Sequence, residues 1–185
     1  MRFMSTAERR SGPEAGGFGP IVVMGVSGCG KSSVGARLAS RINCRFVEGD
    51  AVHPPANVEK MRLGVPLDDA DRLPWLDALG RELASPGDVV LSCSALKRAY
   101  RQHLRSCAGR PLTFVFLHGS RALLASRLSG RKGHFMPSSL LDSQLATLEP
   151  PVGESDVVTV DIDQPLEGIV AAAQAALADR AGRGA

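Results

Sequence analysis

A glycine-rich segment near the start of the chain has the pattern Gly-x-x-x-x-Gly-Lys-Ser. It runs from Gly25 to Ser32, after the apolar run 21–24 and before a helical pattern. Glycines in such a turn let backbone N–H groups converge on a phosphate, and the helix start adds the positive end of its dipole. The lysine can reach the outer phosphates, and the serine hydroxyl can ligate Mg²⁺. The segment therefore predicts a nucleotide site with these ligands: Gly25, Ser27, Gly28, Cys29, Gly30, Lys31, Ser32 and Ser33.

A carboxylate follows the next short apolar run, residues 45–47. In α/β sheets, ligands lie at the carboxyl ends of parallel strands, so we expect Asp50 to face the same crevice as the glycine-rich segment. There it could accept the proton of an attacking hydroxyl or orient that hydroxyl; otherwise it caps a turn before Pro54. His53 could bind a hydroxyl or a carboxylate, and a structural role is equally compatible with its position.

Cationic side chains follow the third apolar run. Lys97 and Arg101 are four residues apart, and a predicted helix over residues 95–105, with Ser94 as its N-cap, places them on one face. Two cations beside a strand end suit a substrate carboxylate or phosphate. The alternative is a solvated basic face, which we take to explain Arg98 and Arg105.

A second basic cluster surrounds a segment with several glycines. Arg127 and Arg131 lie at or near the start of a predicted loop, about residues 130–137, that also contains His134. Flanking glycines are typical of a moving lid, which would bring guanidinium groups to a transferring phosphoryl group and exclude water. The alternative is a basic loop that binds nothing, or that binds nucleic acid.

Other nucleotide-dependent classes lack their signals in this chain. There is no Asn/Thr-Lys-x-Asp element to read guanine, and the third apolar run, residues 88–92, does not end in the acid typical of motor ATPases. Aromatic residues make up only 4% of the chain, which disfavours stacking on single-stranded nucleic acid. What remains is a small phosphotransferase whose substrate supplies the nucleophile.

The elements that must position these residues alternate between strand and helix. Strands are expected over 21–24, 45–47, 88–92, 112–117 and 157–160. Helices are expected over 31–42, 55–63, 71–84 (with Pro74 near its first turn), 95–105, 121–128, 138–148 and 165–178. The alternation predicts an α/β fold, a five-stranded parallel sheet with helices on both faces. We expect a flexible N-terminal tail over residues 1–19 and a single domain over 20–181.

Charge is unevenly distributed along the 185 residues. Residues 89–141 contain nine Lys or Arg and no acid, whereas residues 142–167 contain seven acids and no Lys or Arg. A basic block suggests either an anionic ligand or a solvated face. The four cysteines form no C-x-x-C pair, and neither a secretion signal nor a membrane-spanning run is evident, so we expect a cytoplasmic protein.

Several narrower motifs accompany the glycine-rich segment. They include Gly49-Asp50 with His53-Pro54, Cys93-Ser94-Ala95-Leu96-Lys97 and Arg131-Lys132-Gly133-His134-Phe135. Together with the phosphate-binding segment, they make the chain resemble the thermoresistant gluconokinase family. These are P-loop kinases related in fold to shikimate kinases and nucleoside monophosphate kinases.

The resemblance implies ATP- and Mg²⁺-dependent phosphorylation of D-gluconate at its 6-hydroxyl. It assigns Lys31 and Ser32 to the phosphates and Mg²⁺, and Asp50 to the hydroxyl. It also suggests the following roles: His53, Lys60, Lys97, Arg101 and His134 as gluconate ligands, Arg127 and Arg131 as clamps on the nucleotide and phosphoryl group, and Asp163, Gln164 and Pro165 beside adenine.

The partner implied is thus a small molecule, with no nucleic acid and no membrane. Since members of this family are often dimeric, a homodimer is compatible with the resemblance. Two alternatives stay open at this stage: a kinase for another polyhydroxy acid such as shikimate, and a non-catalytic P-loop module that binds a nucleotide or a nucleic acid.

Overall fold

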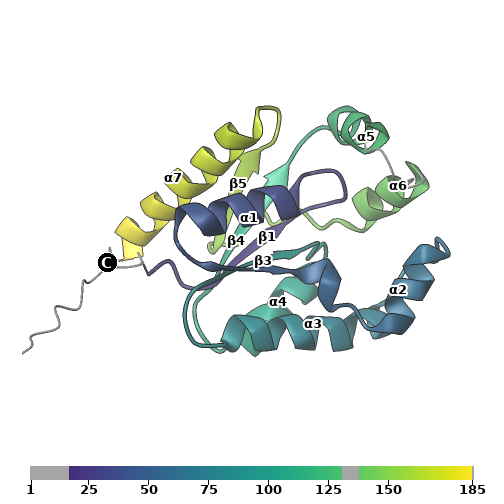
Figure 1. Ribbon diagram of the computed structural model, residues 1–185, viewed down its shortest axis with the longest axis horizontal. Helices are drawn as coiled ribbons and strands as arrows, with labels where there is room; N and C mark the ends of the chain where they lie inside the picture. Colours follow the sequence, from purple (N-terminus) through teal and green to yellow (C-terminus); the bar gives the residue numbers. More distant parts are fainter. Residues whose placement is uncertain (1–16, 131–137, 185) are drawn as a thin grey trace, which may run out of the picture.

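A computed structural model describes residues 17–130 and 138–184 of the chain. Its centre is a parallel sheet of five strands in the order β2-β3-β1-β4-β5 (Figure 1). The strands are β1 (Ile21–Met24), β2 (Arg45–Glu48), β3 (Val89–Cys93), β4 (Thr113–His118) and β5 (Val157–Asp161). The predicted α/β fold is therefore confirmed.

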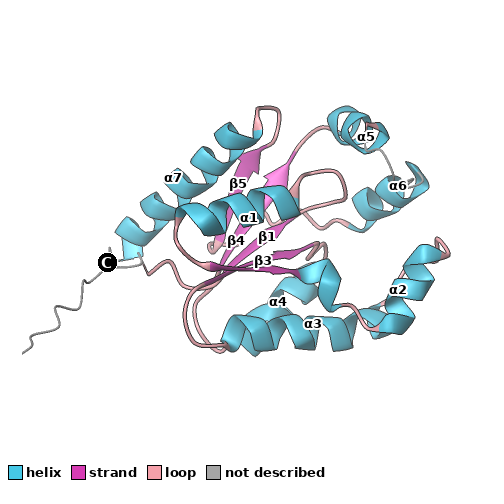
Figure 2. Cartoon of the chain, in the orientation of Figure 1, coloured by secondary structure: helices cyan, strands magenta, loops and turns pink. Residues whose placement is uncertain are grey.

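Helices cover both faces of this sheet (Figure 2). In chain order they are α1 (Lys31–Arg41), α2 (Pro55–Arg62), α3 (Asp69–Ala84), α4 (Arg98–Ala108), α5 (Arg121–Ser129), α6 (Ser138–Thr147) and α7 (Leu166–Gly184), with a short 3-10 turn, η1 (Gly49–Val52), after β2. Helices α1 and α7 lie over one face of the sheet, and α3 and α4 lie side by side over the other (Figure 1). Among the described residues, none of the helices combines the length and the apolar character needed to cross a bilayer.

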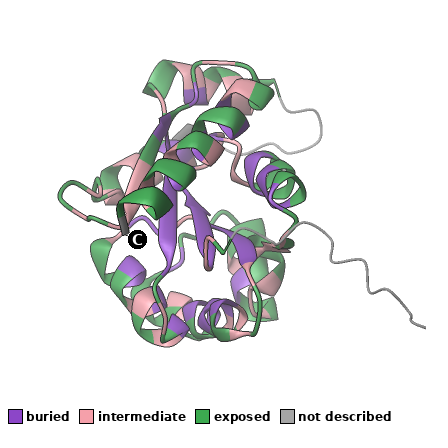
Figure 3. Cartoon of the chain, turned by 90° about the vertical axis from the view of Figure 1, so that its left-hand side faces the viewer, coloured by how far each residue is buried: buried purple, intermediate pink, exposed green. Residues whose placement is uncertain are grey.

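The alternation of side chains along the strands produces two apolar cores. In β1, Ile21 and Val23 pack with α1 and α7, whereas Val22 and Met24 pack with α3 and α4. Both sets are fully buried, which explains why the strand is an uninterrupted apolar run. Figure 3 shows the buried strands between helices whose outer sides are exposed.

Four sequence predictions about helix starts are wrong. Helix α4 begins at Arg98 rather than 95, and its N-cap residue is Lys97 rather than Ser94, because Ala95 has a positive φ of 43° that a helix cannot continue through. Helix α3 begins at Asp69, where Asp68 and Asp71 form a capping box. Pro74 therefore lies in the helix interior and not near the first turn.

Both ends of the predicted domain also differ slightly from expectation. Helix α7 continues beyond residue 181 to Gly184. Residues 17–19 belong to the described part of the chain, and Phe18 packs against the core formed by α1 and α7. The backbone of Pro20 accepts a hydrogen bond from the Thr113 amide at 3.0 Å, which ties this segment to the start of β4.

Candidate functional site

The glycine-rich segment forms a loop between β1 and α1. Gly30, with a φ of 93°, is the residue directly before α1, a conformation that L side chains rarely adopt. Within the described structure, no side chain caps the first turn of α1 and no acidic residue lies in it. The first-turn amides are therefore available to an anion, as the phosphate-binding prediction requires.

Two contacts hold this loop in its present shape. The Lys31 ammonium donates to the Val26 carbonyl at 3.2 Å, across the loop that it follows. The Ser27 amide donates to Oε1 of Gln144 at 2.6 Å, so α6 contributes a side chain to the loop. The Cys29 side chain is fully buried in the core, and only its backbone can face a phosphate.

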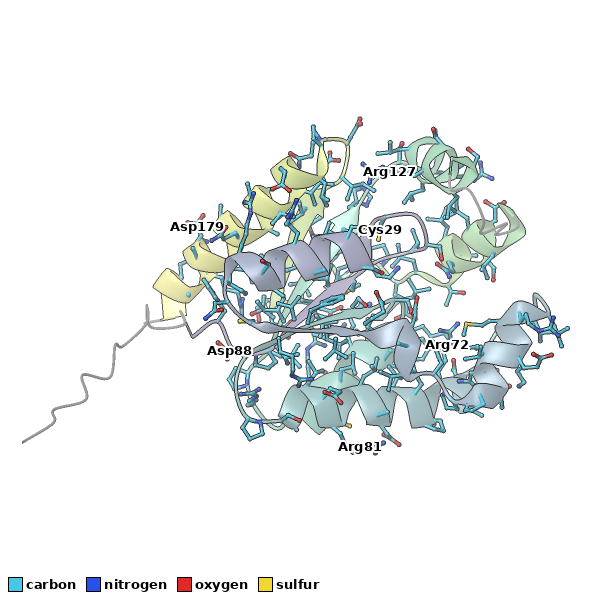
Figure 4. The ribbon with its side chains drawn as sticks, in the orientation of Figure 1. Cys29, Arg72, Arg81, Asp88, Arg127 and Asp179 are labelled. Carbon is cyan, nitrogen blue, oxygen red and sulfur yellow. The ribbon has the colours of Figure 1, made fainter. Side chains whose placement is uncertain are left out.

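A cavity of about 250 Å³ adjoins the loop. Its lining comes from the loop, from α1, from Arg127 of α5, and from Leu166 and Ile169 of α7. Arg127, labelled in Figure 4, donates from Nη2 to the Ile162 carbonyl at 2.6 Å. The turn that contains Asp163, Gln164 and Pro165 directly precedes Leu166 in this lining.

A larger hollow, of about 840 Å³, lies at the opposite end of the sheet. It is lined by Phe18, by the residues around the starts of β4 and β5, and by the last turns of α7. The phosphate loop lies instead at the carboxyl ends of the strands, where ligands bind in folds of this kind. The smaller cavity is therefore the candidate nucleotide site.

The predicted acceptor carboxylate, Asp50, is exposed on η1, directly after β2. Its charge acts on the buried thiol of Cys93, at the end of β3, together with the charges of Lys31 and Arg72. Burial is the main cause that raises the pKa of Cys93 to about 12; a hydrogen bond with the Ala95 backbone opposes the increase, Asp50 adds to it, and Lys31 and Arg72 oppose it. The charges of the phosphate-loop lysine and of the predicted acceptor carboxylate thus both act at the end of β3.

His53 is held in place by an aromatic side chain of α3. Its ring stacks on Trp75 of α3, with centroids 4.1 Å apart and planes 13° apart. The Trp75 indole donates to the Gly49 carbonyl at 2.8 Å and so fixes the residue before Asp50. Burial lowers the pKa of His53, Asp50 raises it and Arg72 lowers it, with a net decrease. His53 is therefore neutral near pH 7 and can both donate and accept a hydrogen bond.

The predicted substrate cations Lys60 and Lys97 are each paired with a carboxylate of α3. Lys60 contacts Asp71 at 2.6 Å, and Lys97 contacts Asp69 at 2.7 Å. Each lysine lowers the pKa of its carboxylate partner through this bond. The Tyr100 hydroxyl also donates to Asp69, at 2.5 Å.

Arg72 is a residue to which the sequence analysis gave no role. Its side chain donates to the Leu67 carbonyl at 3.3 Å. Its guanidinium carbon lies 5.6 Å from the centre of the Tyr100 ring. Asp69, Arg72 and Tyr100 thus add a carboxylate, a cation and a phenol to the predicted acceptor side. Charged residues such as Asp69 and Arg72 are common in the first turn of a helix, so their types alone indicate no function. Only the position of α3 next to η1 makes them candidates for the acceptor side.

Arg101 is not available to a substrate, and this prediction is wrong. Its side chain is fully buried, and its five N–H groups are all bonded. They reach the Ala95 carbonyl at 2.9 Å, the Leu96 carbonyl at 3.1 Å, the Glu149 carbonyl at 3.1 Å and the Glu154 carboxylate. Because α4 starts only after Lys97, Arg101 points into the protein while Lys97 faces Asp69. Arg101 is a structural residue that fixes the backbone leading to Lys97.

The uneven charge along the sequence is partly neutralised in space. Side chains of the basic block pair with those of the acidic block: Arg101 and Arg105 with Glu154, Arg105 also with Asp156, and Arg121 with Asp142. Arg105 is thus ion-paired rather than solvated as predicted. These three arginines of the basic block are therefore engaged within the protein and do not add free positive charge to a surface.

The remaining predicted site residues are only partly placed. Ser32 and Ser33 are exposed in the first turn of α1, beside the loop. Arg131, His134 and all but the first residue of the predicted lid lie outside the described residues.

Comparison with known proteins gives a consistent set of relatives. A family model described as an AAA domain matches residues 21–151. The chain is 54% identical over 144 residues to the gluconokinase of Gluconobacter oxydans (strain 621H), covering 76% of this chain and 80% of that protein. It is 47% identical over 156 residues to the thermoresistant gluconokinase of Escherichia coli (strain K12), covering 81% and 88%.

Solved structures extend the comparison. The crystal structure of a gluconokinase from Sinorhizobium meliloti 1021 aligns with a TM-score of 0.85 at 59% identity, covering 89% of this chain and 94% of that one. Shikimate kinase from Aquifex aeolicus aligns with a TM-score of 0.56 at 17% identity, covering 88% and 98%. At that identity the second likeness shows the fold alone.

Proposed function

Because this chain belongs to the gluconokinase family of P-loop kinases, we propose that it transfers the terminal phosphoryl group of ATP to the 6-hydroxyl of D-gluconate, giving 6-phospho-D-gluconate and ADP. The observation that carries the proposal is the phosphate loop, in which Gly30 leaves the first-turn amides of α1 uncapped beside Lys31, at the same edge of the sheet where Asp50 follows β2. A phosphate-binding lysine, a carboxylate and a second cation are the groups that an in-line transfer to an alcohol needs.

The nucleotide side is built from the loop and the cavity next to it. The uncapped amides of α1 and the Lys31 ammonium bind the phosphates, and Lys31 exchanges its bond to the Val26 carbonyl for the phosphate oxygens. We place the base in the cavity between Arg127 and the start of α7, beside Asp163, Gln164 and Pro165. The exposed hydroxyl of Ser32 suits Mg²⁺, which would neutralise phosphate charge there.

The acceptor side is built on η1, α2 and α3. Asp50 accepts the proton of the 6-hydroxyl as that oxygen attacks, so the carboxylate must be ionised when transfer begins. Neutral His53 and the carboxylates Asp69 and Asp71 offer acceptors to hydroxyl groups of the substrate. Arg72 and Lys97 supply positive charge to its carboxylate. The predicted roles of Arg131 and His134, and the predicted homodimer, stay predictions.

Measuring ADP release over a panel of sugar acids tests this proposal. We expect turnover with D-gluconate to exceed turnover with shikimate and with the 6-deoxy analogue of gluconate, which has no hydroxyl to accept the phosphoryl group. Equal turnover with shikimate would refute the assigned substrate. ATP binding without turnover of any acid, together with salt-sensitive retention of polynucleotide on a filter, would favour the non-catalytic alternative.

A further inference from the structure

Three side chains of different metal-ligand type meet between α3 and α4, on the helical layer behind the acceptor site. They are Asp77 of α3 and His103 and Cys107 of α4, and their ligand atoms all lie within 4.8 Å of one another. His103 and Cys107 are four residues apart and so project from one face of α4. Nothing in the proposed phosphoryl transfer uses any of these groups.

The positions of the three side chains are set by close packing of the two helices. A Cβ placed on Gly80 of α3 would come within 2.3 Å of Cys107 Cβ, so α4 approaches the backbone of α3 at this point. One turn earlier on α3, Asp77 Oδ1 lies 2.6 Å from His103 Nε2. Burial and then the charge of Asp77 raise the pKa of Cys107, and the charge of Arg81, labelled in Figure 4 and one turn after Asp77, opposes the increase.

We propose that Asp77, His103 and Cys107 form a binding site for Zn²⁺, with water as the fourth ligand. A carboxylate, an imidazole and a thiolate are the ligand types that zinc accepts in tetrahedral sites, whereas Mg²⁺ and Ca²⁺ do not favour sulfur or imidazole. Three protein ligands with one open position is a common zinc arrangement.

The present distances are compatible with small side-chain adjustments around the ion. Bonds of about 2.0–2.3 Å to zinc place tetrahedral ligand atoms roughly 3.3–3.7 Å apart. The Asp77–His103 contact of 2.6 Å must therefore open by about 0.7 Å, whereas the Cys107 sulfur already lies within 4.8 Å of both other ligand atoms. Asp77 is exposed and His103 and Cys107 are half-buried, so the ion has a path from solvent.

Occupation of the site would tie two helices that serve the acceptor side. The first turn of α3 carries Asp69, Asp71 and Arg72, and Lys97 is the N-cap residue of α4. Zinc would hold these helices together from the side facing away from the sheet. It would therefore raise the stability of the folded chain by an amount that grows with the logarithm of the zinc concentration divided by Kd, independently of catalysis.

Direct metal binding by the full chain, freed of any histidine tag, tests the site. We expect one equivalent of Zn²⁺ to bind with a dissociation constant below about 1 µM, in competition with a chromophoric chelator. Co²⁺ in its place should show the intense visible bands of tetrahedral coordination and a near-ultraviolet band from thiolate-to-metal charge transfer. The melting temperature should rise when Zn²⁺ is added.

Matched variants locate the binding. Cys107→Ser and His103→Gln should each weaken Zn²⁺ affinity by about 100-fold or more. Cys107→Ser should also abolish the thiolate band, whereas Co²⁺ bound at saturating concentration to His103→Gln should retain it. Cys44→Ser, which removes another half-buried thiol, and His118→Gln, which removes an exposed imidazole, should change neither. The proposal is overturned if the dissociation constant for Zn²⁺ is above about 1 µM. It is also overturned if Cys107→Ser retains full affinity, or if Co²⁺ binds without a thiolate band.

Discussion

Glu154 provides a quantitative test of the buried charge network. Its carboxylate lies 2.5 Å from Nη2 of Arg101 and 2.5 Å from Nη2 of Arg105, and only 5% of its side chain is exposed. The hydrogen bonds from Arg101, and then those from Arg105, lower the pKa of Glu154 from 4.5 to about 2, against the opposing effect of burial. Since one pKa unit corresponds to about 1.4 kcal/mol, this charge contributes about 3 kcal/mol to stability at neutral pH.

Glu154→Gln retains the shape of the side chain and removes its charge. Arg101 is then left buried without an anionic partner, so we expect the free energy of unfolding to fall by about 3 kcal/mol. For a chain of this size, that corresponds to a decrease in Tm of roughly 6–12 °C. Urea-induced unfolding at pH 7 measures the difference directly.

Glu167→Gln is the matched control for this substitution. Glu167 also contacts two arginines, Arg37 and Arg41, but 53% of its side chain is exposed. Solvent screens such pairs, so we expect its loss to cost less than about 1 kcal/mol. An equal loss of stability in the two variants would refute the argument that burial of the network gives it its strength.

The pH dependence provides a second check on Glu154. Because the pKa of the folded state is depressed, the stabilisation is complete above about pH 5 and decreases as the pH falls toward about 2. The difference between the natural chain and Glu154→Gln should therefore shrink with acidification, since protonation removes the same charge as the substitution. A difference that stays constant from pH 7 to pH 4 and below would contradict the assignment.

Two further predictions concern the proposed transfer, and a third concerns the stability of the segment that carries Asp50. Lys31→Ala should lower turnover by at least about 100-fold while far-UV circular dichroism stays unchanged, and near-normal turnover would exclude its role at the phosphates. Asp50→Asn should lower kcat by about 10²–10⁴-fold with little change in the KM for gluconate, and an effect on KM alone would make Asp50 a binding residue instead of the base. Trp75→Phe removes the donor to the Gly49 carbonyl and should cost about 1–3 kcal/mol of stability in urea unfolding, whereas an unchanged midpoint would show that this carbonyl finds another partner.

The strands and the phosphate loop could be predicted because their signals are local. Each strand is a short apolar run between turn residues, and the loop is recognised by glycine spacing between a strand and a helix. The P-loop context of Lys31 and the strand-end position of Asp50 both follow from sequence order alone. The expected sheet and the helices on its two faces agree with the structure for the same reason.

The start of α4 could not be predicted in this way. Ser94 is a good N-cap residue by type, but the Arg101 guanidinium binds the Ala95 and Leu96 carbonyls and delays the helix until Arg98. The spacing of Lys97 and Arg101 then no longer places them on one helical face. Lys97 lies beside Asp69 and Arg101 lies in the core, because each side chain binds a partner that is distant in the sequence.

The acceptor side shows the same limit. Asp69 and Arg72 lie at a helix start, where charged residues are common for reasons of capping, so their types alone carry no functional signal. Their proposed role in substrate binding follows from the packing of α3. This packing places Trp75 against His53 and the first turn of the helix near η1.

The pairing of a basic block with a later acidic block has a consequence for biosynthesis. Arg101 meets Glu154 across 53 positions of the chain. During translation from the amino terminus, α4 emerges before the carboxylate that neutralises its buried guanidinium. The layer formed by α3 and α4 therefore cannot complete its packing until the segment before β5 has left the ribosome, and a chain arrested ahead of residue 154 should remain sensitive to proteases throughout that layer.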